Sequence, residues 1–196
     1  MKIASFLSKY CLDKGYITPE ELPWLQYILE KRLSTIIIFI PLFAIGCYLT
    51  SPLSSFLFLM SFLFLRKRTN GYHASTVVGC FCASMLSVLL FLGLIIRVLS
   101  PWISIFLLII SSIVIIYLSP FEHPLMHWTP EEKAACAASS KGRLLILVVL
   151  VISTYAAGQI EIGNSILLGI TMTAITLVLA QITKRRKRHE KTENNC

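Results

Sequence analysis

Apolar tracts alternate along the whole chain with connectors that are either very short or rich in charge. Six tracts are long enough, or almost long enough, to cross the hydrocarbon core of a bilayer, which is about 30 Å thick and needs roughly 20 helical residues. They cover residues 33–49, 53–65, 75–96, 102–118, 144–157 and 162–182. The second and fifth are short, so we expect flanking residues to complete them, or a tilted or re-entrant path. The pattern predicts an all-α polytopic membrane protein with six transmembrane helices.

The two kinds of connector fall on alternate sides of this arrangement. Short turns lie on one side, at residues 50–52, 100–101 and 158–163. Charged segments lie on the other side, at residues 1–32, 66–72, 119–143 and 184–196. Of the 18 Lys and Arg residues, only Arg97 lies outside the charged segments. Because positive residues gather on the cytoplasmic side of membrane proteins, we expect both termini to lie in the cytoplasm.

The segment before the first tract predicts a helix on the membrane surface. Residues 1–14 place apolar side chains at helical spacing and lysines elsewhere, which is typical of an amphipathic helix on the inner leaflet. The apolar set is Ile3, Phe6, Leu7, Tyr10 and Cys11. Further on, Thr18-Pro19-Glu20-Glu21 resembles a helix start with Thr18 as the N-cap.

These patterns divide the chain into three parts. Residues 1–32 form an amphipathic cytoplasmic segment, residues 33–183 a six-helix transmembrane domain, and residues 184–196 a basic cytoplasmic tail. The run 184–188 contains only Lys and Arg, and its simplest interpretation is an anchor to anionic lipid.

Composition and charge support the membrane interpretation. Hydrophobic residues make up 56% of the chain and charged residues 14%, whereas a soluble domain carries about 25% charged residues. The net charge of +8 would suit nucleic-acid binding, but the basic residues sit at the ends of apolar tracts, as membrane topology requires. We therefore expect membrane lipid, and no nucleic acid, as a partner.

The segment from residue 66 to residue 80 has the chemistry of a cysteine nucleophile. It holds the basic cluster Arg66-Lys67-Arg68, the turn dipeptide Asn70-Gly71, His73, and Cys80 seven residues later. A neighbouring His can activate a thiol and pass its proton to a leaving group. On a continuous helix the two Cα atoms would lie about 10.5 Å apart along the axis, so the helix must begin after His73 if the pair works together.

Two other interpretations of the histidines and cysteines stay open at this point. His73 can be an interfacial polar group, and Cys80 a packing residue in an apolar helix. His123 and His127 have a spacing that would suit a metal site with Cys80, although Pro124 between them argues against a continuous helix. We expect no metal and no cofactor.

The pattern Asn70-Gly71-Tyr72-His73-Ala74 followed by Cys80, in a small basic six-span chain, resembles the AgrB family of membrane peptidases in Gram-positive quorum sensing. The resemblance extends to the amphipathic start, the span spacing, the 119–125 loop and the basic tail. It implies that Cys80 is the nucleophile and His73 the histidine of a cysteine endopeptidase in the bacterial plasma membrane.

The resemblance also implies the substrate and the assembly. The substrate would be an AgrD-type pro-peptide, from which the enzyme removes the acidic tail and promotes closure of the core into a thiolactone or lactone. It also implies a homodimer. Arg66, Lys67 and Arg68 are candidates for holding the acidic tail, although topology anchoring explains them equally well. Asn70 and Glu122 are candidates for orienting His73, and each also suits a turn or loop. The competing class is a non-enzymatic transporter or exporter, which would usually carry more ionisable residues inside its spans.

Overall fold

The computed structural model of the chain describes residues 2–69, 77–121 and 129–193, and these residues contain helices and no strand. The chain divides into two compact units, Met1–Ala44 and Ile45–Cys196. The all-helical prediction is therefore confirmed for the described residues.

The first unit contains α1 (Lys2–Asp13) and most of α2 (Leu22–Leu49). α1 ends because Gly15 adopts a φ of 72°, with Gly15 N–H donating to the Leu12 carbonyl and Tyr16 N–H to the Cys11 carbonyl. This is the hydrogen-bond pattern of a Schellman cap. A helix therefore lies where the amphipathic segment was predicted, and its docking on the membrane stays a prediction.

The predicted helix start, with Thr18 as the N-cap and Pro19 as the first helical residue, is wrong by three residues. Thr18–Glu21 forms a turn, and α2 begins at Leu22. The Thr18 N–H and hydroxyl both donate to the Glu21 carboxylate, at 2.9 and 3.0 Å. These bonds hold the pKa of the Glu21 carboxyl below its ordinary value. The Glu21 carboxylate thus stabilises a turn ahead of the helix. It accepts from the Thr18 N–H in the way that the N3 carboxylate of a capping box accepts from the N-cap N–H.

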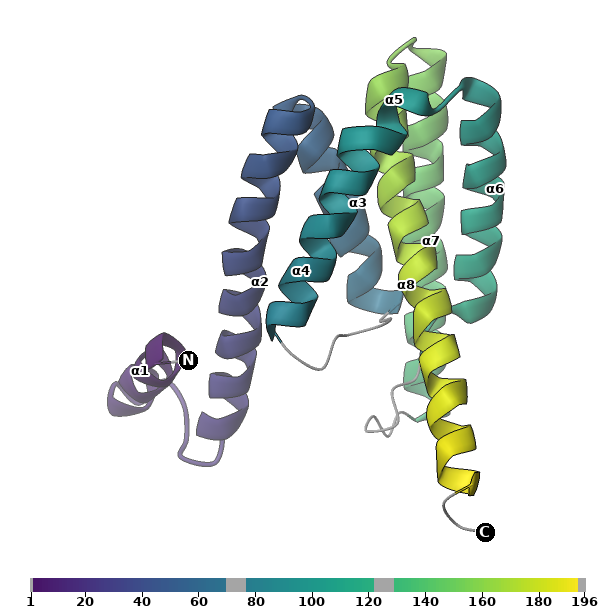
Figure 1. The fold of residues 1–196 in the computed structure, drawn as a ribbon. Coiled ribbons are helices and arrows are strands. Elements are labelled where there is room, and N and C mark those ends of the chain that lie inside the picture. The colour runs from purple at the N-terminus through teal and green to yellow at the C-terminus, as the bar shows by residue number, and fades with distance from the viewer. Residues whose placement is uncertain (1, 70–76, 122–128, 194–196) are drawn as a thin grey trace. The chain divides into compact units, whose positions relative to one another are not determined.

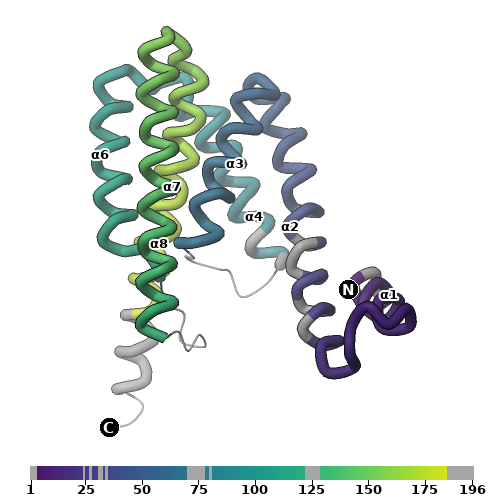
Figure 2. The backbone as a smooth tube through the Cα atoms, turned by 180° about the vertical axis from the view of Figure 1, so that it is seen from behind, coloured from purple at the N-terminus to yellow at the C-terminus, as the bar shows by residue number. Residues whose placement is uncertain are grey.

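The second unit starts in the last turn of α2 and is a helical bundle (Figures 1 and 2). Its helices are α3 (Pro52–Thr69), α4 (Val77–Val88), the π-helix η1 (Leu89–Ile95), α5 (Ile96–Val98), α6 (Pro101–Leu118), α7 (Pro130–Ala156) and α8 (Ile160–Glu193). α8 packs against α3, α6 and α7 and is the central helix. In its most apolar stretch α8 is 61% buried, against 17–22% for Phe81–Val98, α6 and α7.

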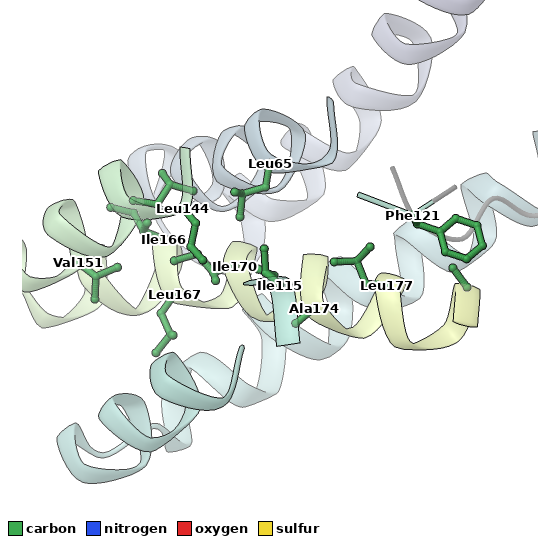
Figure 3. Close-up of a cluster of buried hydrophobic side chains, with 12 residues drawn as sticks. Leu65, Ile115, Phe121, Leu144, Val151, Ile166, Leu167, Ile170, Ala174 and Leu177 are labelled. Carbon is green, nitrogen blue, oxygen red and sulfur yellow. The ribbon is translucent and has the colours of Figure 1, made fainter. Parts of the chain in front are cut away.

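The core of this unit gathers around α8 (Figure 3). It consists of Leu65, Ile115, Phe121, Leu144, Leu147, Val151, Ile166, Leu167, Ile170, Ala174, Leu177 and Ala180. α8 approaches α3 closely at Gly169, where an added Cβ would lie 2.7 Å from the Phe58 carbonyl oxygen. Small residues at such contacts are typical of helices packed in membranes, because they let backbones approach.

Polar side chains also join α8 to its neighbours inside the bundle. The Ser104 hydroxyl donates to Asn164 Oδ1 at 2.9 Å, and the Tyr155 hydroxyl donates to the same atom at 2.6 Å. Deeper in the bundle, the Ser111 hydroxyl donates to Thr171 Oγ1 at 3.2 Å. Because lipid offers no competing partners, these bonds fix the register of α6 and α7 on α8.

Five of the described helices are long and apolar enough to cross a membrane, whereas the sequence predicted six spans. They are Ile28–Leu49, Phe81–Val98, Pro101–Leu118, Pro130–Ala156 and Ile160–Lys184. The remaining predicted tract, 53–65, forms α3, which has only 18 residues and carries three basic residues in its last turn. The count of six spans is therefore not confirmed.

The fifth tract, 144–157, is completed by flanking residues, which was one of the two predicted alternatives. α7 begins at Pro130, well before the predicted residue 144, and runs for 27 residues. Thr129 caps it, with Glu132 N–H donating to the Thr129 hydroxyl and Thr129 N–H donating to the Glu132 carboxylate. This capping box stabilises a helical first turn even though that turn is charged.

The predicted short connectors lie together at one end of the second unit (Figure 1). The Ser54 hydroxyl donates to the Glu161 carboxylate at 2.9 Å, which joins the start of α3 to the start of α8. The Arg97 guanidinium donates to the Leu49 carbonyl at 3.3 Å, which joins α5 to the end of α2. The ends of α3 and α6 and the start of α7 therefore lie at the opposite end, where the candidate site was predicted.

Candidate functional site

The ends of α3 and α6 are tied together at the predicted site. The Phe121 N–H donates to the Thr69 carbonyl at 2.9 Å, and both residues are buried. Close by, the Ser119 hydroxyl donates to the Ser140 hydroxyl at 2.8 Å, which joins the end of α6 to α7. These contacts form a fixed frame at this end of the bundle.

Arg143 of α7 strengthens this frame. Its guanidinium donates to the Phe64 carbonyl at 2.6 Å and lies over the Phe64 ring, 4.7 Å from the ring centre. A cation near the end of α3 also opposes the negative end of that helix dipole. Lys184 of α8 lies over the ring of Phe121, with Nζ 5.6 Å from its centre.

The predicted tail-binding residues occupy the last turn of α3. The Arg66 guanidinium lies over the Phe62 ring, 5.2 Å from its centre, while Lys67 and Arg68 are exposed. With the two cations above they form a surface that we call the basic rim. The basic rim consists of Arg66, Lys67, Arg68, Arg143 and Lys184. Such a surface attracts acidic segments and disfavours basic ones.

Arg143 and Lys184 were not among the residues predicted for the site. The sequence supplied only their charge, which served to predict topology. Their place in the basic rim depends on the packing of α7 and α8 against α3 and α6, and no local pattern reports that packing. The only sequence signal was that both belong to the charged segments on the same predicted side.

Cys80 lies in the first turn of α4, which begins at Val77, and immediately precedes the apolar stretch Phe81–Val98. The candidate nucleophile thus stands at the boundary of a span and at the positive end of a helix dipole, which favours anionic groups. Cys82 is an exposed free thiol on the same helix. Two residues apart on an α-helix, the two side chains leave the axis about 200° apart.

Several predicted residues lie outside what the structure describes. These are His73, Asn70 and Glu122, together with His123 and His127 and the side chain of Cys80. Asn70 and Glu122 directly follow Thr69 and Phe121 in the sequence, so each is one peptide bond away from the hydrogen bond that ties α3 to α6. The catalytic and orienting assignments stay predictions.

The described residues contain no group of three His, Cys, Asp or Glu side chains that would suit a metal ion. The combination of His123, His127 and Cys80 falls outside that search. The alternative of a metal site there is untested.

Comparison with known proteins identifies a family. The family model described as accessory gene regulator B matches residues 1–177, which include the whole segment from Arg66 to Cys80. No curated protein and no solved structure matches the chain.

Proposed function

Because the chain belongs to the AgrB family, which acts in the membrane in processing the autoinducing peptide of agr quorum sensing, we propose that it is a cysteine endopeptidase. Its substrate is an AgrD-type pro-peptide, and the bond cleaved joins the peptide core to the acidic tail. The observation that carries the proposal is the family match across His73 and Cys80, with Cys80 in a helical first turn beside a membrane span.

The reaction begins with acyl transfer to Cys80. His73 accepts the thiol proton as Sγ attacks the carbonyl carbon at the end of the core, and a tetrahedral oxyanion forms. The C–N bond then breaks, and His73 gives the proton to the departing tail amine. The product is a thioester between the core and Cys80. Backbone N–H groups in the first turn of α4 are suited to stabilise the oxyanion, because they point along the helix dipole.

The second step closes the ring. The thiol or hydroxyl within the core attacks the thioester carbonyl, its proton passes through His73 to the Cys80 sulfur, and the C–S bond to the enzyme breaks. With a core thiol, one thioester replaces another at little net free-energy change. Attack by water would instead release a linear peptide. A site at the edge of the membrane can limit that side reaction by excluding water.

The basic rim supports recognition of the acidic tail. Lys67 and Arg68 are exposed, while Arg66 and Arg143 are held against aromatic rings and keep their positions. Opposite charge at such a surface raises the rate of encounter and orients the tail toward the end of α3. Arg66, Lys67 and Arg68 make the main contacts with the tail, because they immediately precede the segment that holds His73.

The fixed frame supports the role of the orienting residues. Thr69 and Phe121 are joined by a hydrogen bond, and Asn70 and Glu122 are the residues that follow them in the sequence. The side chain of either can therefore reach a His73 imidazole near that point. An acceptor for the imidazole N–H would fix the tautomer that takes the Cys80 proton.

In the proposed topology this end of the bundle faces the cytoplasm and both termini lie there. The proposed enzyme works as a homodimer.

Mass spectrometry of the enzyme tests the proposal directly. We expect a pro-peptide whose core nucleophile is replaced by Ala to leave an acyl adduct on Cys80 of the wild type. Cys80→Ala should lose the adduct and cleavage, while Cys82→Ala, on the same helix but the other face, is the matched control and should keep both. His73→Ala should lose turnover, with slow acylation returning above about pH 8.5, where free thiolate forms.

An adduct on Cys82 or Cys136, or full cleavage by Cys80→Ala, would overturn the assignment. Complete absence of adduct and cleavage in the wild type, with peptide still crossing the membrane, would instead favour the transporter class.

A further inference from the structure

α3 joins the two ends of the second unit although it is short for a membrane span. Near its start, the Ser54 hydroxyl donates to the Glu161 carboxylate, at the end that holds the short connectors. Near its other end, a backbone carbonyl of α3 accepts from the Arg143 guanidinium. The uncharged part of α3, from Pro52 to Arg66, rises by about 21 Å along the helix axis. The hydrocarbon core of a typical bilayer is about 30 Å thick, so α3 does not match it.

α6 gives the same value from a different kind of boundary marker. It carries an exposed aromatic side chain near each end, Trp102 at 83% and Tyr117 at 82% exposed. Trp and Tyr gather at the two interfaces between membrane and water. These two residues are separated by about 22 Å along the helix axis. The exposed side chains between them are all large and apolar, namely Ile103, Ile105, Phe106, Ile109, Ile110, Ile113 and Ile116.

Arg143 marks the charged boundary on α7, and its guanidinium is held in place. It donates to the Phe64 carbonyl at 2.6 Å and lies over the Phe64 ring, so it is not free to follow a thicker lipid layer outward. From Arg143 to Ala156, the last residue of α7, the helix rises by about 20 Å. The Ser119–Ser140 hydrogen bond places the end of α6 beside the same part of α7. Three helices therefore agree on the distance between the two boundaries.

α8 is longer, but its central position explains the difference. Asn164 and Thr171 of α8 accept from hydroxyl groups of α6 that lie 60 positions earlier in the chain. On this register α6 ends at Leu118 while α8 continues for several more residues to Lys184, which belongs to the basic rim. The extra length of α8 therefore extends past the boundary that Tyr117 marks, on the charged side.

We infer that the exposed face of α6 and α7 is an interaction surface for lipid with short acyl chains. It fits a hydrocarbon layer of about 20–22 Å, and it thins an ordinary bilayer around the protein. In a layer of that thickness α3 is long enough to cross. The α7 part of this face consists of Leu145, Ile146, Val149, Leu150 and Ile152, which are all exposed.

Thinning has a consequence for the charged end of the bundle. A layer of ordinary thickness would bury Arg143 and the end of α3 in hydrocarbon, which is costly for a charge. A thin layer instead places the basic rim among the lipid headgroups. The inference concerns the lipid surface alone and does not rest on the proposed function.

Quenching of tryptophan fluorescence by brominated lipid tests the preference without relying on catalysis. The reporter is Ile109→Trp, midway along α6, in a full-length chain that also carries Trp24→Phe, Trp102→Tyr and Trp128→Phe. Brominated phosphatidylcholine with chains of about 18 carbons competes in reconstituted bilayers with unbrominated lipids of other chain lengths. We expect lipid with chains of about 14 carbons to bind this face at least about twofold more strongly than the 18-carbon lipid.

Two results of the quenching experiment would overturn the inference. One is equal binding at all chain lengths, or strongest binding at about 18 carbons or more, because the face would then fit an ordinary bilayer. The other is a reporter that no brominated lipid quenches, because protein, such as a second copy of the chain, would then cover the face.

The aromatic boundary markers have a matched control on the same helix. In the reporter chain, leucine at positions 102 and 117 removes both interfacial rings, and we expect the twofold preference to fall toward equal binding. Phe106→Leu removes a ring that is 65% exposed from between the two boundaries, and it should keep the preference. A full preference without the two interfacial rings, or its loss in Phe106→Leu, would overturn Trp102 and Tyr117 as the markers that set the thickness.

Discussion

Gly169→Ala gives a direct measure of the contact between α8 and α3. The added Cβ would lie 2.7 Å from the Phe58 carbonyl oxygen, 2.8 Å from Ser61 Cβ and 3.1 Å from the Phe62 backbone nitrogen. Two of these atoms belong to backbone, so the helices must separate. Overpacking of this kind costs about 1–3 kcal/mol. The change from Gly to Ala also stabilises a helix by roughly 0.8–1.0 kcal/mol, which hides part of that cost.

A second glycine removes this ambiguity. Gly142→Ala makes the same gain in helix propensity in open space, so the difference between the two variants isolates the steric cost. We expect Gly169→Ala to be less stable than Gly142→Ala by about 1–3 kcal/mol. The assay is unfolding in mixed micelles with increasing sodium dodecyl sulfate, followed by circular dichroism. Equal stability of the two variants would show that α3 and α8 are not in backbone contact at Gly169.

Three further predictions concern the bundle, the topology and the N-terminus. Tyr155→Phe removes one of the two donors to Asn164 and should cost about 0.6 kcal/mol in the same unfolding assay, as is usual for polar contacts inside membranes; a cost near zero would mean that the Tyr155 hydroxyl does not stabilise the bundle. In intact cells, Lys67→Cys should resist a membrane-impermeant thiol reagent and Trp102→Cys should react, and the reverse result would invert the proposed orientation. Deletion of residues 1–14 should leave insertion intact but weaken pro-peptide processing, because this helix can dock the substrate leader at the inner leaflet; normal processing would reduce it to an anchor.

Hydropathy predicted the helices best where the apolar tract and the helix end at the same residues. The tract 102–118 forms α6 (Pro101–Leu118), and the connector 50–52 falls where α2 ends and α3 begins. It located the apolar part of α7 but not the start of that helix, because hydropathy reports transfer into lipid and the first turns of α7 are charged. The signal for the true start was present in Thr129 and Glu132, whose side chains form a capping box.

Two features had no adequate signal in the sequence. The π-helical backbone of η1 lies inside the predicted apolar tract 75–96, and hydropathy reports only how apolar a stretch is, not which hydrogen bonds its backbone makes. The pairing of His73 with Cys80 could be predicted from the sequence, because it rests only on the residue types and their spacing. The contact between Arg143 and the end of α3 arises only when two distant helices meet, so charge counting could not reveal it.

The central position of α8 means that the bundle can be completed only after the last helix of the chain has entered the membrane. α3, α6 and α7 all precede α8 in the chain, so a ribosome delivers them to the bilayer before their main packing partner exists. Until α8 arrives, polar groups such as Ser104 and Ser111 wait in lipid without the partners that they have in the finished bundle. A chain that ends before α8 therefore lacks the interhelical hydrogen bonds that join α6 to α8. The insertion of one late helix thus supplies the packing partner of α3, α6 and α7 in a single event.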